Sequence, residues 1–416
     1  MPTKWLPISN SCPSALPMGK RVSRAACVLG PPLLILIVLV LLGAPTPTYA
    51  QVVTDSGSSP QVAAPSGSYA VGHLLLDWED SARYELATRD PGDRRVLTAE
   101  IWYPAELGSG RTAAYLTRLD AYAAEWDDET VEFLRAVEVP WHDGAVVADG
   151  KFPILLFSHG WSSRAASYST FLANVASHGY VVLGIDHPYL GRVAMADGSV
   201  TEPTEDHFKE QRETEDFYAA DVMFILDRLT DLDETGAFEN ALALDRIAAA
   251  GHSSGFGSVM SGAAALDPRI KALISFDSGV GRAAREIGLA QPLLLFRADS
   301  ASYTDLFFRG PKVHPRGTIY DVDFFRRYSG SFYDLVVPGT THGSVFDGYL
   351  WAEDAEDRSS QLRALDVFGT YAVAFLDATL KGEPTQLLRA TEAGEERAVT
   401  LRVIRPLDDA DERDVP

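Results

Sequence analysis

The sequence predicts an α/β protein with a doubly wound, mostly parallel sheet and helices on both of its faces. Runs of apolar, β-branched and aromatic residues alternate with segments of helical periodicity from about residue 69 onward. The run 153–157 is continuously apolar, which is typical of a strand buried on both faces. Alternation of such strands with helices favours a parallel sheet over a sandwich or a helix bundle.

Each element follows from its local pattern. The runs 71–78 and 96–103 are rich in β-branched and aromatic residues, which favour strands. Apolar residues recur at helical spacing in 168–176, and Gly179 is suited to end that helix. Further strands are expected at 180–185, 247–250, 270–276, 292–296 and 333–337, and further helices at 218–229 and 365–376.

Composition and charge limit the classes of partner. The 416-residue chain is 46% hydrophobic, which is ordinary for a globular enzyme, and its net charge is -22 at pH 7. So acidic a chain lacks the basic footprint of nucleic-acid binding and is repelled by anionic membranes. We therefore expect no nucleic-acid partner and infer no obligatory protein partner. The excess of Asp and Glu over Lys and Arg is interpreted as a feature that keeps the protein soluble.

Residues 1–50 have the organisation of a secretory signal peptide. Basic residues at 20–24 precede the apolar run 33–42, and residues 48–50 (Thr-Tyr-Ala) resemble a cleavage site. We therefore expect a secreted or periplasmic protein, with an uncleaved N-terminal membrane anchor as the alternative. Cys12 and Cys27 both lie in this segment, so the mature protein would contain no cysteine.

The rest of the chain is interpreted as one domain with flexible ends. Residues 51–68 resemble a flexible linker, 69–405 form the expected domain, and 406–416 form an acidic tail. The long aromatic segment 302–330 is expected to form a wall of the substrate site, with Phe324 and Phe325 facing the substrate. The alternative is that its rings pack the segment onto the body of the domain.

The pentapeptide 251–255, Gly-His-Ser-Ser-Gly, has the pattern G-x-S-x-G between a strand-like and a helix-like run. This is the context of a nucleophile elbow, in which Ser253 lies on a sharp turn from strand to helix. Gly251 and Gly255 flank the serine because a side chain at either position would clash in so tight a turn. The amides that open the helix would favour negative charge developing at the site.

A serine nucleophile needs a histidine base and an acid that orients it, and in this architecture they follow the serine as acid, then histidine. Only His314 and His342 follow Ser253. We favour His342, which comes just after the expected strand 333–337 and would lie in a loop over the serine.

The acid is expected to be Asp277. It ends the strand 270–276, and a carboxylate at the carboxyl end of a sheet strand faces the active-site edge. Asp299 and Asp305 follow the next strand and are the rival candidates.

The oxyanion hole needs two backbone amides. Ser254 supplies one and Trp161 is the candidate for the other, while Gly160 allows close approach to the substrate. His159, His187 and His252 are interpreted as packed structural residues. No metal-binding spacing is found, so neither a metal nor a cofactor is expected.

Several of these motifs, in this order, resemble a known family. The chain is similar to the α/β-hydrolase group of plasma-type platelet-activating-factor acetylhydrolases and their bacterial relatives, close to the dienelactone-hydrolase-like enzymes. The resemblance implies an α/β-hydrolase fold and places the acid at Asp277. Phe256 occupies the position where the family has a second glycine. We expect its side chain to narrow the part of the substrate site that holds the acyl group. The matching motifs are 99–105, 157–161, 176–180, 251–255, 276–279 and the loop around His342.

The expected function is that of a secreted serine esterase acting on a small-molecule ester or lipid. The resemblance implies short-acyl esters, including acetylated or oxidised phospholipids. A polyester or cutinase-like hydrolase with the same triad is the first alternative. In related polyester hydrolases the acid lies one strand later, where this chain has Ala301. The second alternative is a hydrolase fold used only for binding.

Overall fold

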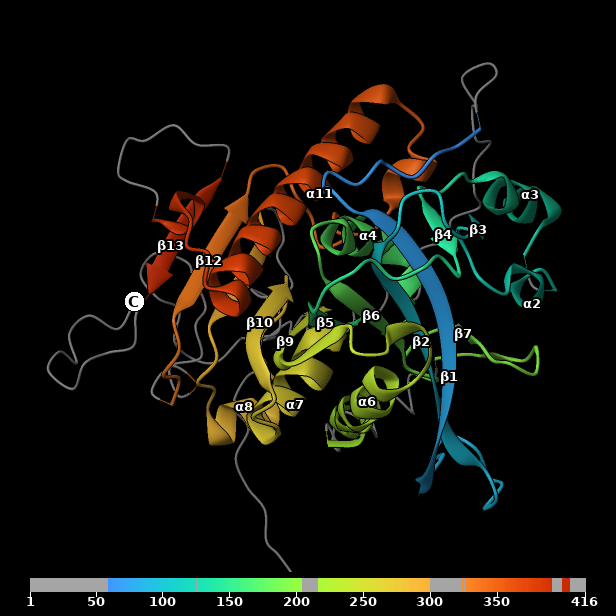
Figure 1. Cartoon of the computed structure of the whole chain (residues 1–416), viewed down its shortest axis with the longest axis horizontal. Coiled ribbons are helices and arrows are strands. Elements are labelled where there is room, and N and C mark those ends of the chain that lie inside the picture. Colours follow the sequence, from blue (N-terminus) through green and yellow to red (C-terminus); the bar gives the residue numbers. More distant parts are fainter. Residues whose placement is uncertain are drawn as a thin grey trace, which may run out of the picture. The chain divides into compact units, whose positions relative to one another are not determined.

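A computed structural model of the chain describes residues 59–124, 126–203, 216–299, 324, 327–390 and 399–404. Within these ranges, eleven strands form one sheet in the order β13-β12-β11-β10-β9-β5-β6-β2-β1-β4-β3 (Figure 1). The expected signal peptide and acidic tail lie outside the described residues.

The sheet is parallel at its centre and mixed towards its edges, where β1 pairs antiparallel with β2 and parallel with β4. Strands β6, β5, β9, β10, β11 and β12 run parallel, whereas β2 pairs antiparallel with β6 and β13 pairs antiparallel with β12. This confirms the mostly parallel sheet expected from the alternating pattern. The strands are β1 (Ala70–Tyr84), β2 (Arg94–Ala105), β3 (Arg111–Thr112), β4 (Trp141–Asp143), β5 (Phe152–Ser158), β6 (Val181–Asp186), β9 (Leu242–His252), β10 (Ile270–Phe276), β11 (Leu293–Ala298), β12 (Phe332–Val337) and β13 (Thr400–Ile404).

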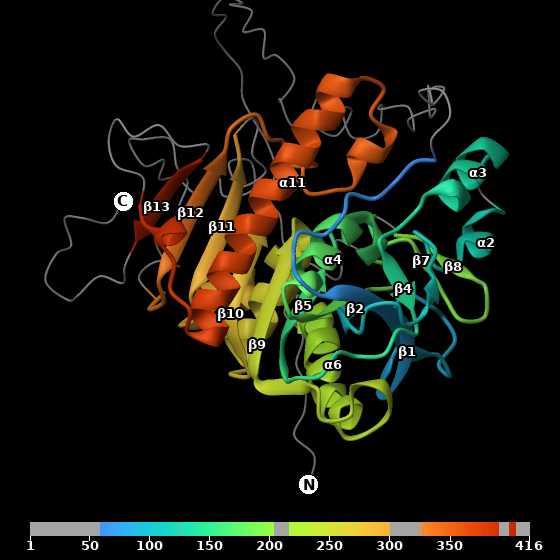
Figure 2. The same cartoon turned by 45° about the horizontal axis from the view of Figure 1, so that its top comes forward.

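Helices cover both faces of the sheet. One face carries α4 (Ser169–Ser177) and α11 (Ala355–Leu376), and the other carries α6 (Asp216–Glu234), α7 (Ser261–Leu266) and α8 (Arg282–Ile287). Figure 1 labels all five helices, and Figure 2 shows α4, α6 and α11 from a second direction. Outside the sheet, β7 (Val193–Ala194) and β8 (Val200–Thr201) form a separate hairpin. The short elements are α2 (Leu119–Tyr122), α3 (Asp128–Ala136), η1 (Ala165–Tyr168), η2 (Gly236–Phe238), η3 (Gly255–Met260), η4 (Gly348–Trp351), η5 (Asp377–Lys381) and η6 (Gln386–Leu388).

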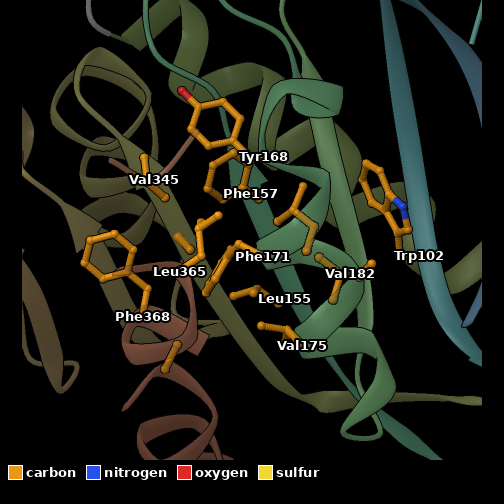
Figure 3. Packing of buried hydrophobic residues seen from close by; sticks show 14 of the residues in the cluster. Trp102, Leu155, Phe157, Tyr168, Phe171, Val175, Val182, Val345, Leu365 and Phe368 are labelled. Atoms are coloured by element: carbon orange, nitrogen blue, oxygen red, sulfur yellow. The ribbon is translucent and has the colours of Figure 1, made fainter. Parts of the chain in front are cut away.

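The central strands are buried on both faces because their side chains alternate between two apolar clusters. In β5, Leu155 and Phe157 belong to the cluster under α4 and α11, whereas Ile154 and Leu156 belong to the cluster on the other face. Figure 3 shows the first cluster, in which Phe171 of α4 packs among these strand residues. The continuously apolar run in the sequence is thus explained by a core on each side.

The segment before β1 differs from the expected flexible linker. In its described part, 59–68, the Val62 amide donates to the Glu138 carbonyl and the Ser66 amide donates to Asn174 Oδ1. Val62 is also buried in the core. These contacts fasten the segment to the domain, so the linker interpretation is wrong for residues 59–68. Within the described ranges, none of the helices combines the length and the apolar character needed to cross a membrane.

Candidate active site

Ser253 lies on the expected sharp turn between β9 and η3. Its φ is 53°, in the left-handed region that non-glycine residues rarely adopt. A Cβ on Gly255 would lie 2.2 Å from the carbonyl oxygen of His159, and one on Gly251 would lie 2.7 Å from the carbonyl carbon of Gly255. Both glycines are therefore required by close backbone contacts, as the motif predicts.

The register of the sheet brings the elbow and the expected acid together. His252 of β9 pairs with Phe276 of β10, so Ser253 and Asp277 leave neighbouring parallel strands at the same edge. The Ser253 amide donates to the Phe276 carbonyl oxygen at 3.2 Å, which ties the elbow to the neighbouring strand end.

Asp277 contacts the expected base directly. Its Oδ2 lies 2.7 Å from His342 Nδ1, and its Oδ1 accepts a hydrogen bond from the Ala298 amide at 3.2 Å. The Asp277 side chain is 6% exposed, and its backbone is held at a φ of 47°. With one oxygen on the imidazole and the other on the backbone, Asp277 can orient the ring and stabilise its positive charge.

The rival acid Asp299 has a different role in the structure. Asp299 Oδ2 accepts from the Gly339 amide at 3.0 Å, and the Asp299 amide donates to the Thr340 carbonyl oxygen at 3.2 Å. Asp299 therefore holds the turn that leads to His342. Asp305 and His314 lie outside the described residues.

The loop that carries His342 is anchored by a buried carboxylate that the sequence did not reveal. Asp347 accepts from Ser169 Oγ at 2.7 Å, from the Thr170 amide at 3.2 Å and from Tyr115 Oη at 3.2 Å. Burial raises the pKa of Asp347 to about 6, although these hydrogen bonds act in the opposite direction. Asp347 thus joins the His342 loop to the N-terminus of α4.

The two expected oxyanion-hole residues, Trp161 and Ser254, directly follow Gly160 and Ser253 in the chain, and the backbone at Gly160 lies close to Ser253. A Cβ on Gly160 would lie 3.3 Å from Ser253 Cβ, so the backbone before Trp161 passes beside the nucleophile. The Gly160 amide itself donates to Tyr168 Oη at 3.0 Å. Ser254 immediately precedes η3, where helix amides begin. The Trp161 side chain is 40% exposed at this edge.

The three other histidines expected to be structural are buried and neutral. Burial lowers the pKa of both His159 and His252 to about 3, and it also lowers the pKa of His187. His187 Nδ1 lies 2.8 Å from Asp221 Oδ2, and its Nε2 lies 2.9 Å from Ser158 Oγ. This second Ser-His-Asp arrangement is fully buried, so it cannot contact a substrate.

The expected aromatic wall is corrected in its described part. Phe256 is fully buried in the core beneath the elbow, and Phe324 is 3% exposed and packs on Tyr328 with ring centroids 5.2 Å apart. Both rings fill the cluster shared with α6 and α7, so neither lines the substrate site. Phe325 and the segment 301–323 lie outside the described residues.

A small hollow borders the Asp277–His342 pair, lined also by Thr341, Val345 and Phe368. Among the described residues, no group of three or more histidine, cysteine or acidic side chains is placed to hold a metal ion. The reactive groups described at this edge are a serine, a histidine and a carboxylate.

Parts of the chain are similar to known proteins. Residues 144–303 match the chlorophyllase family. The chain is 29% identical over 286 residues to a protein of the fungus Arthroderma benhamiae named a probable 1-alkyl-2-acetylglycerophosphocholine esterase; the match covers 60% of this chain and 70% of that protein.

A solved structure shows the same fold. The ferulic acid esterase from Streptomyces cinnamoneus superposes with a TM-score of 0.66 at 24% identity, over 83% of this chain and 99% of the other. The sheet order, the helices on both faces and this similarity agree with one another. The chain therefore has the α/β-hydrolase fold and is similar to proteins named as esterases.

Proposed function

We propose that Ser253, His342 and Asp277 form a catalytic triad that hydrolyses carboxylic esters through an acyl-enzyme. The observation that carries the proposal is the 2.7 Å contact of His342 Nδ1 with Asp277 Oδ2, next to a serine on a strained elbow. A carboxylate and an imidazole paired at the sheet edge that carries the serine are the groups that acyl transfer requires.

In the first half of the reaction, Ser253 Oγ attacks the ester carbonyl while His342 Nε2 takes its proton. Asp277 holds Nδ1, fixes the tautomer and stabilises the imidazolium. The amides of Trp161 and Ser254 donate to the oxyanion of the tetrahedral intermediate. The imidazolium then protonates the leaving alcohol, and the acyl group remains on Ser253.

In the second half, His342 removes a proton from water, which attacks the acyl-enzyme. The second tetrahedral intermediate collapses, Ser253 recovers its proton and the carboxylic acid leaves.

We propose short-acyl esters, including acetylated or oxidised phospholipids, as the substrates. The name of the fungal relative and the resemblance of the ordered motifs support this class. The test is hydrolysis by the purified protein of p-nitrophenyl esters of increasing acyl length, a phospholipid with an sn-2 acetyl group, and a polyester film. Ser253→Ala serves as the blank.

A preference for acetyl esters that includes the phospholipid would support the proposal. Cleavage only of the film and of long-chain esters would favour the polyester alternative. No hydrolysis at all would favour a protein that uses the fold for binding.

We also propose that residues 1–50 direct export and are removed after Ala50. The basic and apolar runs and the Thr-Tyr-Ala sequence support this. Mass spectrometry of the protein from an expressing cell culture should find an N-terminus at Gln51. Membrane-bound protein that begins at Met1 would support the anchor instead.

A further inference from the structure

Three segments of the candidate site are joined by consecutive hydrogen bonds through Tyr168 and His252. The Gly160 amide lies 3.0 Å from Tyr168 Oη, which lies 2.9 Å from His252 Nδ1. His252 Nε2 lies 2.9 Å from the carbonyl oxygen of His342. We call this series of contacts the Tyr168 relay. It runs from the loop beside Trp161 to the backbone of the candidate base.

The chemistry of the end groups fixes the direction of every bond in the relay. The His342 carbonyl can only accept, so His252 Nε2 carries a proton and donates it. His252 is neutral because burial and the nearby His342 lower its pKa to about 3, which leaves Nδ1 as an acceptor. Tyr168 must then donate its only hydroxyl proton to Nδ1, and its oxygen accepts from the Gly160 amide. One arrangement of protons satisfies all three contacts.

Packing leaves the relay little room to move. Tyr168 is fully buried between Phe157 and Phe346, with ring centroids at 4.7 Å and 4.9 Å, and Phe346 also packs on His252. Figure 3 shows the Tyr168 ring beside Phe157 with its hydroxyl directed away from the labelled core residues. The position of the hydroxyl is therefore set by rings that have no polar role.

The relay lies next to the nucleophile. A Cβ on Gly160 would lie 2.9 Å from His252 Nδ1 and 3.3 Å from Ser253 Cβ. The His252 and His342 rings also lie close, with centroids 4.4 Å apart. A shift of a few tenths of an ångström in the relay would therefore move the Trp161 amide, the His342 ring or both.

We propose that Tyr168 is a positioning residue that fixes the distance between the oxyanion-hole loop and the His342 loop through His252. Its hydroxyl acts by holding the Gly160 amide and, through His252, the His342 backbone. This role presupposes the proposed esterase function, whereas the hydrogen bonds themselves can be tested without turnover.

Tyr168→Phe removes one oxygen and keeps the packed ring. Because a buried amide and Nδ1 lose their partner at the site where the oxyanion forms, kcat should fall by about 10- to 100-fold with little change in KM. Tyr103→Phe is the matched control, since it also removes a buried tyrosine hydroxyl. The Tyr103 hydroxyl donates to the Ala145 carbonyl oxygen at 2.8 Å and lies on the other face of the sheet. That control should keep its kcat.

A double-mutant cycle tests whether the residues act as one unit. His252→Gln retains an amide donor and lacks the ring acceptor for Tyr168. If the relay is one unit, the double variant should be no slower than the slower single variant. The proposal would be overturned if the loss in kcat of the double variant equalled the product of the two single losses. Equal kcat values for Tyr168→Phe and Tyr103→Phe would overturn it as well.

Two measurements do not need activity. In Tyr168→Phe, hydrogen exchange of the Gly160 amide should become faster, and the downfield proton between His342 Nδ1 and Asp277 should shift. Unchanged exchange and an unchanged resonance would also overturn the relay. If the wild-type protein lacks esterase activity but both signals move, the proposed function fails while the relay stands.

Discussion

His342 Nδ1 lies 2.7 Å from Asp277 Oδ2, although 65 residues separate the two in the chain. The parallel register of β9 with β10, and of β11 with β12, brings the loops that follow these strands to one edge of the sheet. The contact between Asp277 and His342 therefore depends on the order and register of these strands.

Ser253→Ala should abolish ester hydrolysis and leave the fold intact. Loss of the nucleophile in a serine hydrolase typically lowers kcat by on the order of a millionfold. Alanine fits the space of serine, so the melting temperature should change little. Ser258→Ala, in η3 five residues after the nucleophile, is the control and should hydrolyse normally. Hydrolysis by Ser253→Ala at the wild-type rate would remove Ser253 from the mechanism.

Asp277→Asn and Asp299→Asn should separate the two candidate acids. The amide in Asp277→Asn favours the wrong tautomer of His342, and kcat should fall by about ten-thousandfold. Asp299 accepts from the Gly339 amide, whereas Asp277 contacts the His342 ring, so replacing Asp299 should cost far less activity. Steady-state kinetics of both variants decide the assignment. A larger loss in Asp299→Asn would transfer the role to that residue.

Much of this site could be predicted from the sequence because its signals are local. The apolar run 153–157 and the glycines around Ser253 determine a buried strand and a sharp turn by themselves. Asp277 could be placed because it ends a strand. The roles of Tyr168 and Asp347 could not, because they depend on contacts with partners far away in the chain.

The misassigned aromatics have a similar cause. The sequence shows that Phe256 and Phe324 are large and apolar. It does not show whether their rings face the core, as they do in the structure, or the substrate site. The helical turns η3 and η5, which have π-helical geometry, also lack a signal in composition or periodicity. Sequence patterns therefore located the elbow, whereas the lining of the substrate site needed three-dimensional packing.

Phe324→Ala tests the corrected role of that ring. A buried phenylalanine replaced by alanine leaves a cavity and should lower the free energy of unfolding by about 3–5 kcal/mol. Because the ring packs on Tyr328 in the core, the ratio of rates for short and long acyl esters should stay the same. Thermal unfolding and the ester panel measure the two effects. A changed acyl preference at unchanged stability would restore Phe324 to the substrate wall.

Gly255→Ala tests the close contact beneath the elbow. Its Cβ would lie 2.2 Å from the His159 carbonyl oxygen, so the backbone must shift, at a cost of about 1–3 kcal/mol in stability. Activity should fall as well, because the loop before Trp161 moves. Gly262→Ala in α7 is the matched control: its Cβ would meet Ala219 at 3.4 Å, an ordinary contact, and alanine favours a helix. Equal melting temperatures for the two variants would contradict the contact.

Asp347→Asn tests the carboxylate that anchors the His342 loop, through the pH dependence of stability. Burial raises the pKa of Asp347 from 3.8 to about 6, so the folded protein binds this proton more tightly than the unfolded chain does. The contribution of Asp347 to the free energy of unfolding therefore decreases by about 3 kcal/mol in total as the pH rises from about 4 to 6. Above that range the contribution is constant. Asparagine does not titrate, so the variant should lack this part of the decrease.

Urea unfolding of the wild type and of Asp347→Asn at several pH values between 4 and 7 measures the difference. The free energy of unfolding of the wild type should decrease relative to that of the variant as the pH rises. The loss of the anchor itself shifts the variant's stability at all pH values, whereas only titration of Asp347 changes the slope. Parallel curves for the two proteins would mean that Asp347 keeps the same protonation in the folded and unfolded states, and that burial does not raise its pKa.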